Sequence, residues 1–215
     1  PALAIKGSFG MSQKGKSLRY ALIGLQFVIS IAFIICAIFL KKQHSYMMNY
    51  DMGFNKECLL TANIPVSSMD ERDAFSSELL NNPNIKEVAW SQDRMVADSR
   101  MTWGRNHHGE QMMLTVMPVS WNFLQVMGIE VVEGRDFLPS DEKGDGAIIL
   151  NEYAKKKYNL NLEEVINWNG KPFPATGFCR DFHFKPLHEE SDAFAFYIYD
   201  SKMLNKYFST PHLTL

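Results

Sequence analysis

The most apolar part of the chain is the run from Tyr20 to Leu40, YALIGLQFVISIAFIICAIFL, which holds 21 residues without a charge. As a helix this run is about 31 Å long, which matches the hydrocarbon core of a bilayer. Thirteen of its residues are Leu, Ile, Val or Phe, and together they favour membrane insertion by about 4 to 8 kcal/mol. A helix on the surface of a soluble sheet would need a polar face, and this one has none. The pattern therefore predicts a membrane span, continued as helix to about Tyr50 and broken by Gly53.

After the span, the pattern changes to short segments with helical or alternating periodicity. Helices are predicted over 67–83 with Ser67 or Ser68 as N-cap, over 120–128 between Ser120 and Gly128, and over 151–160. Strands are predicted over 57–65, 85–93, 129–137, 146–151, 172–184 and 192–200, with a hairpin over 102–120 that turns at 106–109. Strands and helices mix without regular alternation, so we expect an α+β domain and not a doubly wound sheet.

One motif argues for a nucleotide site. GMSQKGKS, from Gly10 to Ser17, fits the phosphate-loop pattern G-x-x-x-x-G-K-[ST]. Such a loop needs a buried strand before it and a sheet-packed helix after it, but here a membrane span follows. FAFYIYD, which ends at Asp200, could supply the acidic residue of a second strand. Its alternation of aromatic and small residues suits a strand with one covered face, not a fully buried one. We therefore interpret GMSQKGKS as a basic segment before the membrane.

The charge distribution orients the predicted span. Residues 1–50 carry six Lys and Arg and no acid, and four of the six precede Tyr20. Because positive charge marks the cytoplasmic side, the N-terminal segment is predicted to be inside and the residues after about 45 outside. A cleaved signal peptide would have a shorter apolar region and a small-x-small cleavage site. The run ends AIFLKKQ instead, so we expect no cleavage.

The remaining 165 residues hold all 24 acidic residues and 16 Lys and Arg, a net charge of about −8. This excludes a typical nucleic-acid binder, which needs clustered cations. The length suffices for one substantial domain or two small lobes. Cys58 and Cys179 could pair outside the cytoplasm, but two buried thiols are the preferred interpretation, because two cysteines form no disulfide framework.

Three stretches together resemble a known family. VSWNFLQVMGIEVVEGRDF, AIILNEYAKKKY and GFCRDFHFKPLHEE follow the order and spacing found in the periplasmic core domain of MacB-like and FtsX-like ABC transporter permeases. The N-terminal PALAIKGSF and the span after it look like the start of the second half of a two-halved permease. Cys179 departs from the family, which usually has Val there, and Trp168 opens a turn where the family often has Gly-Lys.

The resemblance implies a non-enzymatic permease subunit without an ATP site or cofactor. A separate cytoplasmic ATPase would move the membrane helices, and the motion would drive export or mechanotransmission in the periplasm. It also implies an inner-membrane location, a dimer of subunits or halves, a possible periplasmic or outer-membrane partner, and a domain with a porter-like lobe and a smaller β-rich lobe. We expect residues 1–16 to be cytoplasmic, 17–50 to form the span and its extension, and 51–215 to form a domain truncated at Leu215.

The candidate chemical groups have simpler interpretations. His107 and His108 are adjacent in a predicted hairpin and point to opposite faces, so they cannot chelate together. Asp181 and His183 share a face, and His188 is near, but no further ligand completes a metal site; a strand-end hydrogen bond is favoured.

The other candidate groups also have structural interpretations. Arg135 and Asp136 are expected to fix a turn. A glycosidase pair drawn from Glu130, Glu133 and Asp136 would carry no weight on an acidic surface. The apolar set that we expect in the core, or failing that at a partner surface, is Trp90, Met112, Met113, Trp121, Phe123 and Met127. No catalytic, cofactor or metal residue is nominated.

A membrane-anchored sensor that binds a ligand or partner without any ATPase is the alternative function. A phosphate-loop enzyme is a third and weaker one.

Overall fold

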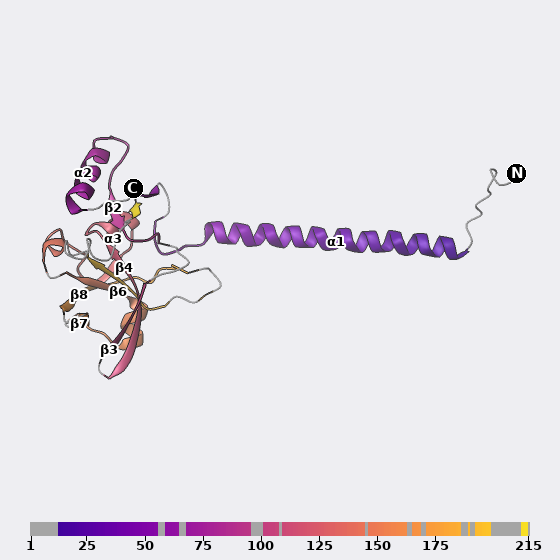
Figure 1. The fold of residues 1–215 in the computed structure, drawn as a ribbon. Helices are drawn as coiled ribbons and strands as arrows, with labels where there is room; N and C mark the ends of the chain where they lie inside the picture. The colour runs from indigo at the N-terminus through magenta and orange to yellow at the C-terminus, as the bar shows by residue number, and fades with distance from the viewer. Residues whose placement is uncertain are drawn as a thin grey trace. The chain divides into compact units, whose positions relative to one another are not determined.

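The chain consists of two compact units, Pro1–Tyr50 and Asp51–Leu215. The computed structural model describes residues 13–55, 59–64, 68–95, 101–107, 109–144, 146–162, 165–168, 171–185, 189, 192–198 and 212–214. The first unit contains the long helix α1, and the second contains the sheet and the shorter helices (Figure 1).

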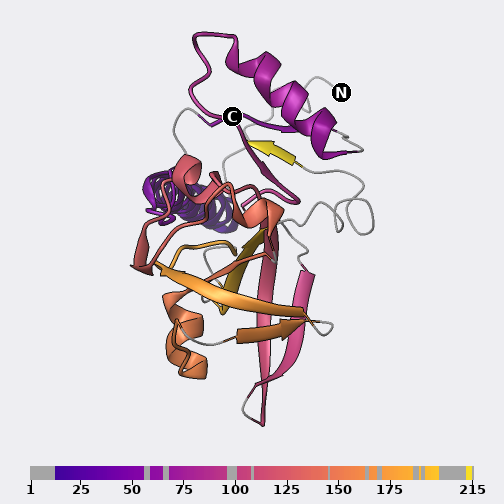
Figure 2. The same cartoon turned by 90° about the vertical axis from the view of Figure 1, so that its left-hand side faces the viewer.

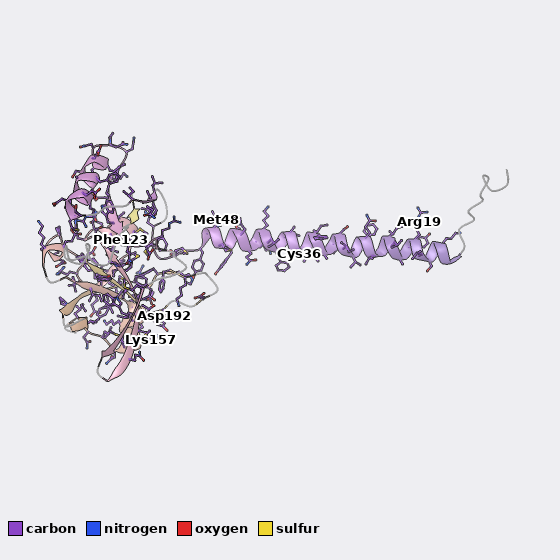
Figure 3. All side chains as sticks on the ribbon, in the orientation of Figure 1. Arg19, Cys36, Met48, Phe123, Lys157 and Asp192 are labelled. Carbon is purple, nitrogen blue, oxygen red and sulfur yellow. The ribbon has the colours of Figure 1, made fainter. Side chains whose placement is uncertain are left out.

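Helix α1 extends from Gln13 to Asn49, so it begins four residues before the predicted start. Residues 13–17, the second part of GMSQKGKS, therefore belong to the helix that carries the apolar run. Every described side chain from Gly15 to Asn49 is exposed, and Figure 3 shows Arg19, Cys36 and Met48 projecting from the helix. Within the described part of the chain, this is the one helix long and apolar enough to cross a membrane.

The second unit is built on one mixed sheet with the strand order β1-β10-β2-β4-β9-β6-β8-β5, to which β3 is added beside β4 and β7 beside β8. The strands are β1 (Thr61–Asn63), β2 (Ala89–Ser91), β3 (Met101–His107), β4 (Glu110–Val119), β5 (Val131–Gly134), β6 (Ile148–Asn151), β7 (Val165–Trp168), β8 (Lys171–Cys179), β9 (Phe194–Ile198) and β10 (His212–Thr214). β4 pairs with β9, and β6 with β8, in parallel; the other pairs are antiparallel. The predicted α+β class is confirmed.

Three α-helices and one short 3-10 helix accompany the sheet: α2 (Met69–Leu80), α3 (Phe123–Met127), α4 (Glu152–Tyr158) and η1 (Asp141–Lys143). α2 lies at one end of the domain, and the β3–β4 hairpin extends toward the opposite end, as both Figure 1 and Figure 2 show. The hairpin confirms its prediction, with a regular register from the pair Met101–Val116 to the pair His107–Glu110.

The helix ends show which local signals were interpreted correctly. Ser68 is the N-cap of α2, and its hydroxyl accepts a hydrogen bond from the Glu71 amide at 3.2 Å. Gly128 ends α3 in the left-handed conformation, with φ of 65°. The prediction of Ser120 as the cap of α3 is wrong: the N-cap is Asn122, which makes no side-chain cap bond. The Ser120 hydroxyl is bonded to Trp90 and Asn122 instead.

Several strands are shorter than predicted. Of the stretch 57–65 the structure describes only β1 as strand, 85–93 reduces to β2, and 172–184 ends at Cys179. β7 was not predicted at all. It is only four residues long and pairs with β8 alone, so it carries too little periodicity to distinguish it from a loop.

β9 is the centre of the core, and here the prediction of one covered face is wrong. Phe194, Phe196 and Ile198 belong to one apolar cluster, whereas Ala195 and Tyr197 belong to another on the opposite face. All five residues are completely buried. The small alanines mimic an exposed face in the sequence, but they leave room for a second layer of side chains.

Candidate functional site

The Asp-Phe-His stretch after β8 contains the two residues considered for a metal site. The Asp181 carboxylate accepts a hydrogen bond from the Tyr153 amide at 2.8 Å, near the start of α4. The His183 amide donates to the Met52 carbonyl at 2.7 Å. No group of three or more metal-ligating side chains occurs among the described residues. The bond to Tyr153 confirms the predicted strand-end hydrogen bond for the Asp181 side chain, whereas the bond of His183 is made by its backbone. The side chains of His107, His108 and His188 lie outside the described residues.

The partner of this stretch is the segment that opens the second unit, Asp51–Asn55, which we call the junction segment. It begins with a tight turn in which the Gly53 amide donates to the Asp51 carboxylate at 2.9 Å. Gly53 has a φ of 77° and lies against the Asp-Phe-His stretch. A Cβ atom at Gly53 would be 2.9 Å from both the Asp181 carbonyl oxygen and the Phe182 Cα. Both the backbone conformation and the available space therefore require glycine here.

Two backbone hydrogen bonds and one side chain hold the junction segment on the domain. The Met52 carbonyl accepts from His183, and the Asn55 amide donates to the Met127 carbonyl at 2.7 Å, at the end of α3. Between them, Phe54 packs against the aromatic cluster of the core. The segment is thus bonded to two parts of the domain that are more than 50 residues apart in the sequence.

The side chain of Asn151 connects the Asp-Phe-His region to β9. Asn151 is fully buried and is the N-cap of α4. Its amide oxygen accepts from Ala154 and Phe194, and its amide nitrogen donates to the Asp192 carbonyl, at 2.9–3.1 Å. Three of the four hydrogen bonds that the amide group can make are therefore formed, and they link the start of α4 to β9.

The aromatic cluster beneath the junction segment is rigidly packed. The rings of Phe182, Phe184, Phe194 and Phe196 have neighbouring centroids 4.6–5.7 Å apart. These are the separations of favourable offset and edge-to-face contacts. A displacement applied to Phe54 therefore meets a closely packed surface.

A second group of polar contacts lies between α2 and the rest of the domain. Arg72 is 5% exposed, and its guanidinium binds both carboxylate oxygens of Glu142 at 3.0 and 3.3 Å and the carboxylate of Asp73 at 2.9 Å. Burial alone would lower the pKa of Arg72, but the hydrogen bonds and charges of Glu142 and Asp73 raise it. Glu142 also accepts from the Trp121 amide at 3.1 Å. A cleft of about 190 Å³ opens beside these residues.

The expected turn at Arg135 and Asp136 is confirmed, with an additional partner. Arg135 donates to the Asp136 carbonyl at 2.9 Å and binds both oxygens of Asp141 at 2.8 and 3.0 Å. Burial would raise the pKa of Asp141, but the hydrogen bonds from Arg135 and the Leu138 amide lower it. Burial raises the pKa of Asp136. Glu130 and Glu133 form ion pairs with Arg180 and Lys155 on the surface.

The remaining candidates are core residues for the most part. Trp90, Met112, Phe123 and Met127 are buried, Trp121 is half-buried and Met113 is 45% exposed. Cys179 is a buried free thiol whose pKa is raised by desolvation, so it is no activated nucleophile; Cys58 lies outside the described residues. Among the described residues, the most extensively bonded feature outside the regular sheet is thus the junction segment and its contacts with the domain.

Sequence reasoning missed the junction segment and the Arg72–Glu142 pair. Gly53 was interpreted only as a helix breaker, although its second constraint is contact with Phe182. Arg72 and Glu142 are 70 residues apart, and each resembles an ordinary surface charge. The one available signal was the Asp-Phe-His stretch itself, whose role could not be deduced without its partner.

Comparisons with known proteins identify the family of the chain. The family model of the MacB-like periplasmic core domain matches residues 23–208. Among solved structures, the periplasmic region of MacB from Actinobacillus actinomycetemcomitans is similar, with 16% identity and a TM-score of 0.47 over 76% of each chain. The extracellular domain of the noncanonic ABC-type transporter YknZ from Gram-positive bacteria has 20% identity and a TM-score of 0.43, over 72% of this chain and 82% of that one. No curated protein matches the sequence.

Proposed function

The chain belongs to the family of MacB-like periplasmic core domains of ABC transporter permeases, and from this premise we propose that it couples ATP hydrolysis in the cytoplasm to work in the periplasm. A separate ABC ATPase hydrolyses ATP and displaces the membrane helices of the permease. The displacement drives export or mechanotransmission by the domain after Tyr50. The permease acts as a dimer of subunits or halves, together with a periplasmic or outer-membrane partner.

The proposed topology places residues 1–16 in the cytoplasm and 17–50 in the inner membrane with an extension beyond it. Residues 51–215 are then periplasmic. The apolar surface of α1 and the basic residues before it support this orientation. A helix of 37 residues is about 55 Å long, so it reaches well beyond a hydrocarbon core of about 30 Å. Because its backbone is internally hydrogen-bonded, such a helix can carry an axial displacement across the bilayer.

The observation that carries the proposal is the junction segment. A flexible linker after the helix would absorb a displacement, but residues 51–55 form a tight turn held by two backbone hydrogen bonds of 2.7 Å. Gly53 allows close contact with Asp181 and Phe182, and Phe54 packs on the core. The start of the domain is therefore fixed to its interior, as transmission of force requires.

Hydrogen exchange of the full-length permease with its ATPase in lipid nanodiscs tests the proposal. Exchange is compared without nucleotide and with ATP and vanadate. We expect the amides of Asn55 and His183, which donate the two junction bonds, to change their exchange rates when nucleotide binds. Unchanged rates at both amides, in a complex that hydrolyses ATP, would contradict coupling through this segment and favour a sensor that needs no ATPase.

Two glycine variants provide a matched comparison. Gly53 and Gly109 both have left-handed backbones, with φ of 77° and 86°, but a Cβ atom at Gly109 meets nothing within 4 Å. Both Gly53→Ala and Gly109→Ala therefore incur backbone strain, whereas only the first disrupts the junction. We expect Gly53→Ala to abolish the nucleotide-dependent change and Gly109→Ala to retain it.

The topology is tested separately with reporters fused after Leu215. A reporter active only outside the cytoplasm should be active, and one fluorescent only in the cytoplasm should be dark. The opposite result would reverse the proposed orientation of α1.

A further inference from the structure

Helix α3 lies in the chain between two bonded regions: its C-terminal end contacts the junction segment, and the residues just before it contact Glu142, Trp90 and Val88. At its C-terminal end, the Met127 carbonyl accepts the hydrogen bond from the Asn55 amide, and Gly128 lies against Asn55. Along its length, Phe123, Leu124 and Met127 are buried in the core. A short helix held in this way moves as one body, because its backbone is internally bonded and its side chains are closely packed.

The three residues before α3 bind the elements at the other end. Ser120 and Trp90 exchange two hydrogen bonds of 2.8 Å: the Trp90 amide donates to the Ser120 hydroxyl, and the Ser120 amide donates to the Trp90 carbonyl. The Asn122 side chain donates to the Val88 carbonyl at 2.9 Å. The Trp121 amide donates to Glu142, which in turn binds Arg72 of α2.

Helix α2 joins the domain through the Arg72–Glu142 pair, through a hydrogen bond of 2.8 Å from the Trp90 indole to the Ser76 hydroxyl, and through apolar contacts. The apolar residues Phe75 and Leu79 of α2 pack on Val88 and Trp90, and together they form a small cluster separate from the two main ones. β2 itself joins β4 through one register pair, Ser91 with Val119. The cleft of about 190 Å³ separates part of α2 from the region of Ser120 to Asn122.

The Arg72–Glu142 pair is suited to fix a position more than to add stability. Both side chains are at most 10% exposed, so their desolvation offsets most of their attraction. Their bidentate geometry nevertheless defines where α2 sits relative to the residues before α3. A change in that geometry would be transmitted as a movement of α2, because the cleft beside it leaves room.

We propose that α3 and the Arg72–Glu142 pair transmit displacement of the junction segment to α2, so that α2 moves with the membrane helix during ATP hydrolysis. This inference rests on the proposed coupling function and names the element that responds. Glu142 and Arg72 are positioning residues in this scheme. Asn55, α3, Trp121, Glu142 and Arg72 form one continuous series of bonded elements.

The test is hydrogen exchange of the full-length permease–ATPase complex in nanodiscs, measured at the junction amides and at the amides of α2. In the wild type, ATP with vanadate should change exchange at both places. Glu142→Gln keeps the size of the side chain but removes its charge. We expect it to reduce the nucleotide-dependent change at α2 by at least about fivefold and to leave the change at Asn55 and His183 intact. Arg72→Lys, which cannot bind bidentately, should give an intermediate reduction.

A neighbouring ion pair supplies the control. Asp141 is adjacent to Glu142 and binds Arg135 bidentately, but this pair connects the turn only to η1. Asp141→Asn should keep the response of α2. Thermal unfolding followed by tryptophan fluorescence checks that each variant is folded, since all four tryptophans lie after residue 50.

The outcomes separate this inference from the proposed function. If the junction responds to nucleotide but α2 does not, or if Glu142→Gln leaves the response of α2 unchanged, the inference is wrong and the coupling function stands. The same holds if Asp141→Asn abolishes the response as completely as Glu142→Gln. If neither the junction nor α2 responds in the wild type, the coupling function itself fails.

Discussion

The extracytoplasmic domain contains two differently stabilised regions, the aromatic cluster around β9 and the polar contacts beside α2. In the first, Phe182, Phe194 and Phe196 are almost completely buried and contact one another through their rings. In the second, the buried side chain of α2 is an arginine, and it forms an ion pair with Glu142.

The two regions differ in their main contribution. The aromatic cluster mainly stabilises the domain, and the polar contacts mainly define where α2 lies. The free energy of an apolar contact grows with the area that it removes from water, so the closely packed phenylalanines contribute mainly to the stability of the domain. Hydrogen bonds and bidentate ion pairs are directional, so the contacts beside α2 add less net stability but define geometry. We therefore expect substitutions in the aromatic cluster to change the free energy of unfolding most, and those in the polar regions to change it less.

The largest effect is expected for Phe196→Ala. Phe196 is fully buried and its ring contacts Phe123, Phe182 and Phe194. Removal of the ring should lower the free energy of unfolding by about 3–5 kcal/mol. Urea unfolding of the chain in mild detergent, followed by tryptophan fluorescence, measures this. Leu138→Ala, at a side chain 47% exposed, should change it by less than about 1 kcal/mol; equal losses would contradict the assignment of the core.

A smaller effect is expected for Asn151→Ala, which tests a polar contact inside the same core. The substitution leaves the amides of Ala154 and Phe194 without their acceptor, and we expect a loss of about 2–3 kcal/mol. Asn151→Asp keeps the acceptor and removes the donor to Asp192. If the alanine variant were as stable as the wild type, this network would not fix α4 to β9.

Ser68→Ala should have a moderate effect, confined to α2. Loss of the N-cap bond to Glu71 is expected to cost about 1 kcal/mol. Ser77→Ala provides the comparison within the same helix, because the Ser77 hydroxyl donates only to the Asp73 carbonyl one turn earlier, and this change should be close to neutral. Hydrogen exchange of the first turn of α2 distinguishes the two variants; equal exchange would argue against capping by Ser68.

The smallest effect is expected for Asp141→Asn, and it depends on pH. The pKa of Asp141 is lowered in the folded chain, so the unfolded chain binds its proton more readily. The stabilisation is therefore present above the ordinary pKa of about 3.9 and is lost as pH falls through the lower folded value. Asp192, whose pKa is also lowered, acts in the same direction, and Asp136, whose pKa is raised, acts in the opposite one.

We expect Asp141→Asn to reduce stability at pH 7 by less than about 1 kcal/mol. The variant should also make the decline of stability below about pH 4 shallower. Urea unfolding at several pH values measures both quantities. An acid decline identical to that of the wild type would show that Arg135 does not stabilise the ionised carboxylate.

Local signals in the sequence were sufficient where one segment decides its own structure. The continuous apolar run determines α1, because a helix of that composition has no polar face to offer water. Ser68 and Gly128 mark helix ends through bonds and backbone angles formed within a few residues. The turn at Arg135 was predictable for the same reason, although its partner Asp141 was not.

The tertiary structure alone decided the remaining contacts, because they join residues far apart in the chain. Every residue offers the same backbone donor and acceptor, so nothing in the local sequence indicates that His183 binds Met52 or that Asn55 binds Met127. Likewise, β9 is buried on both faces only because a separate cluster of distant residues covers each face, while β4 and β6 pair with its two edges. The sequence by itself determined the apolar helix, the class of the domain and the family. The packing of distant segments decided how the junction segment is held on the domain and how Arg72 of α2 pairs with Glu142.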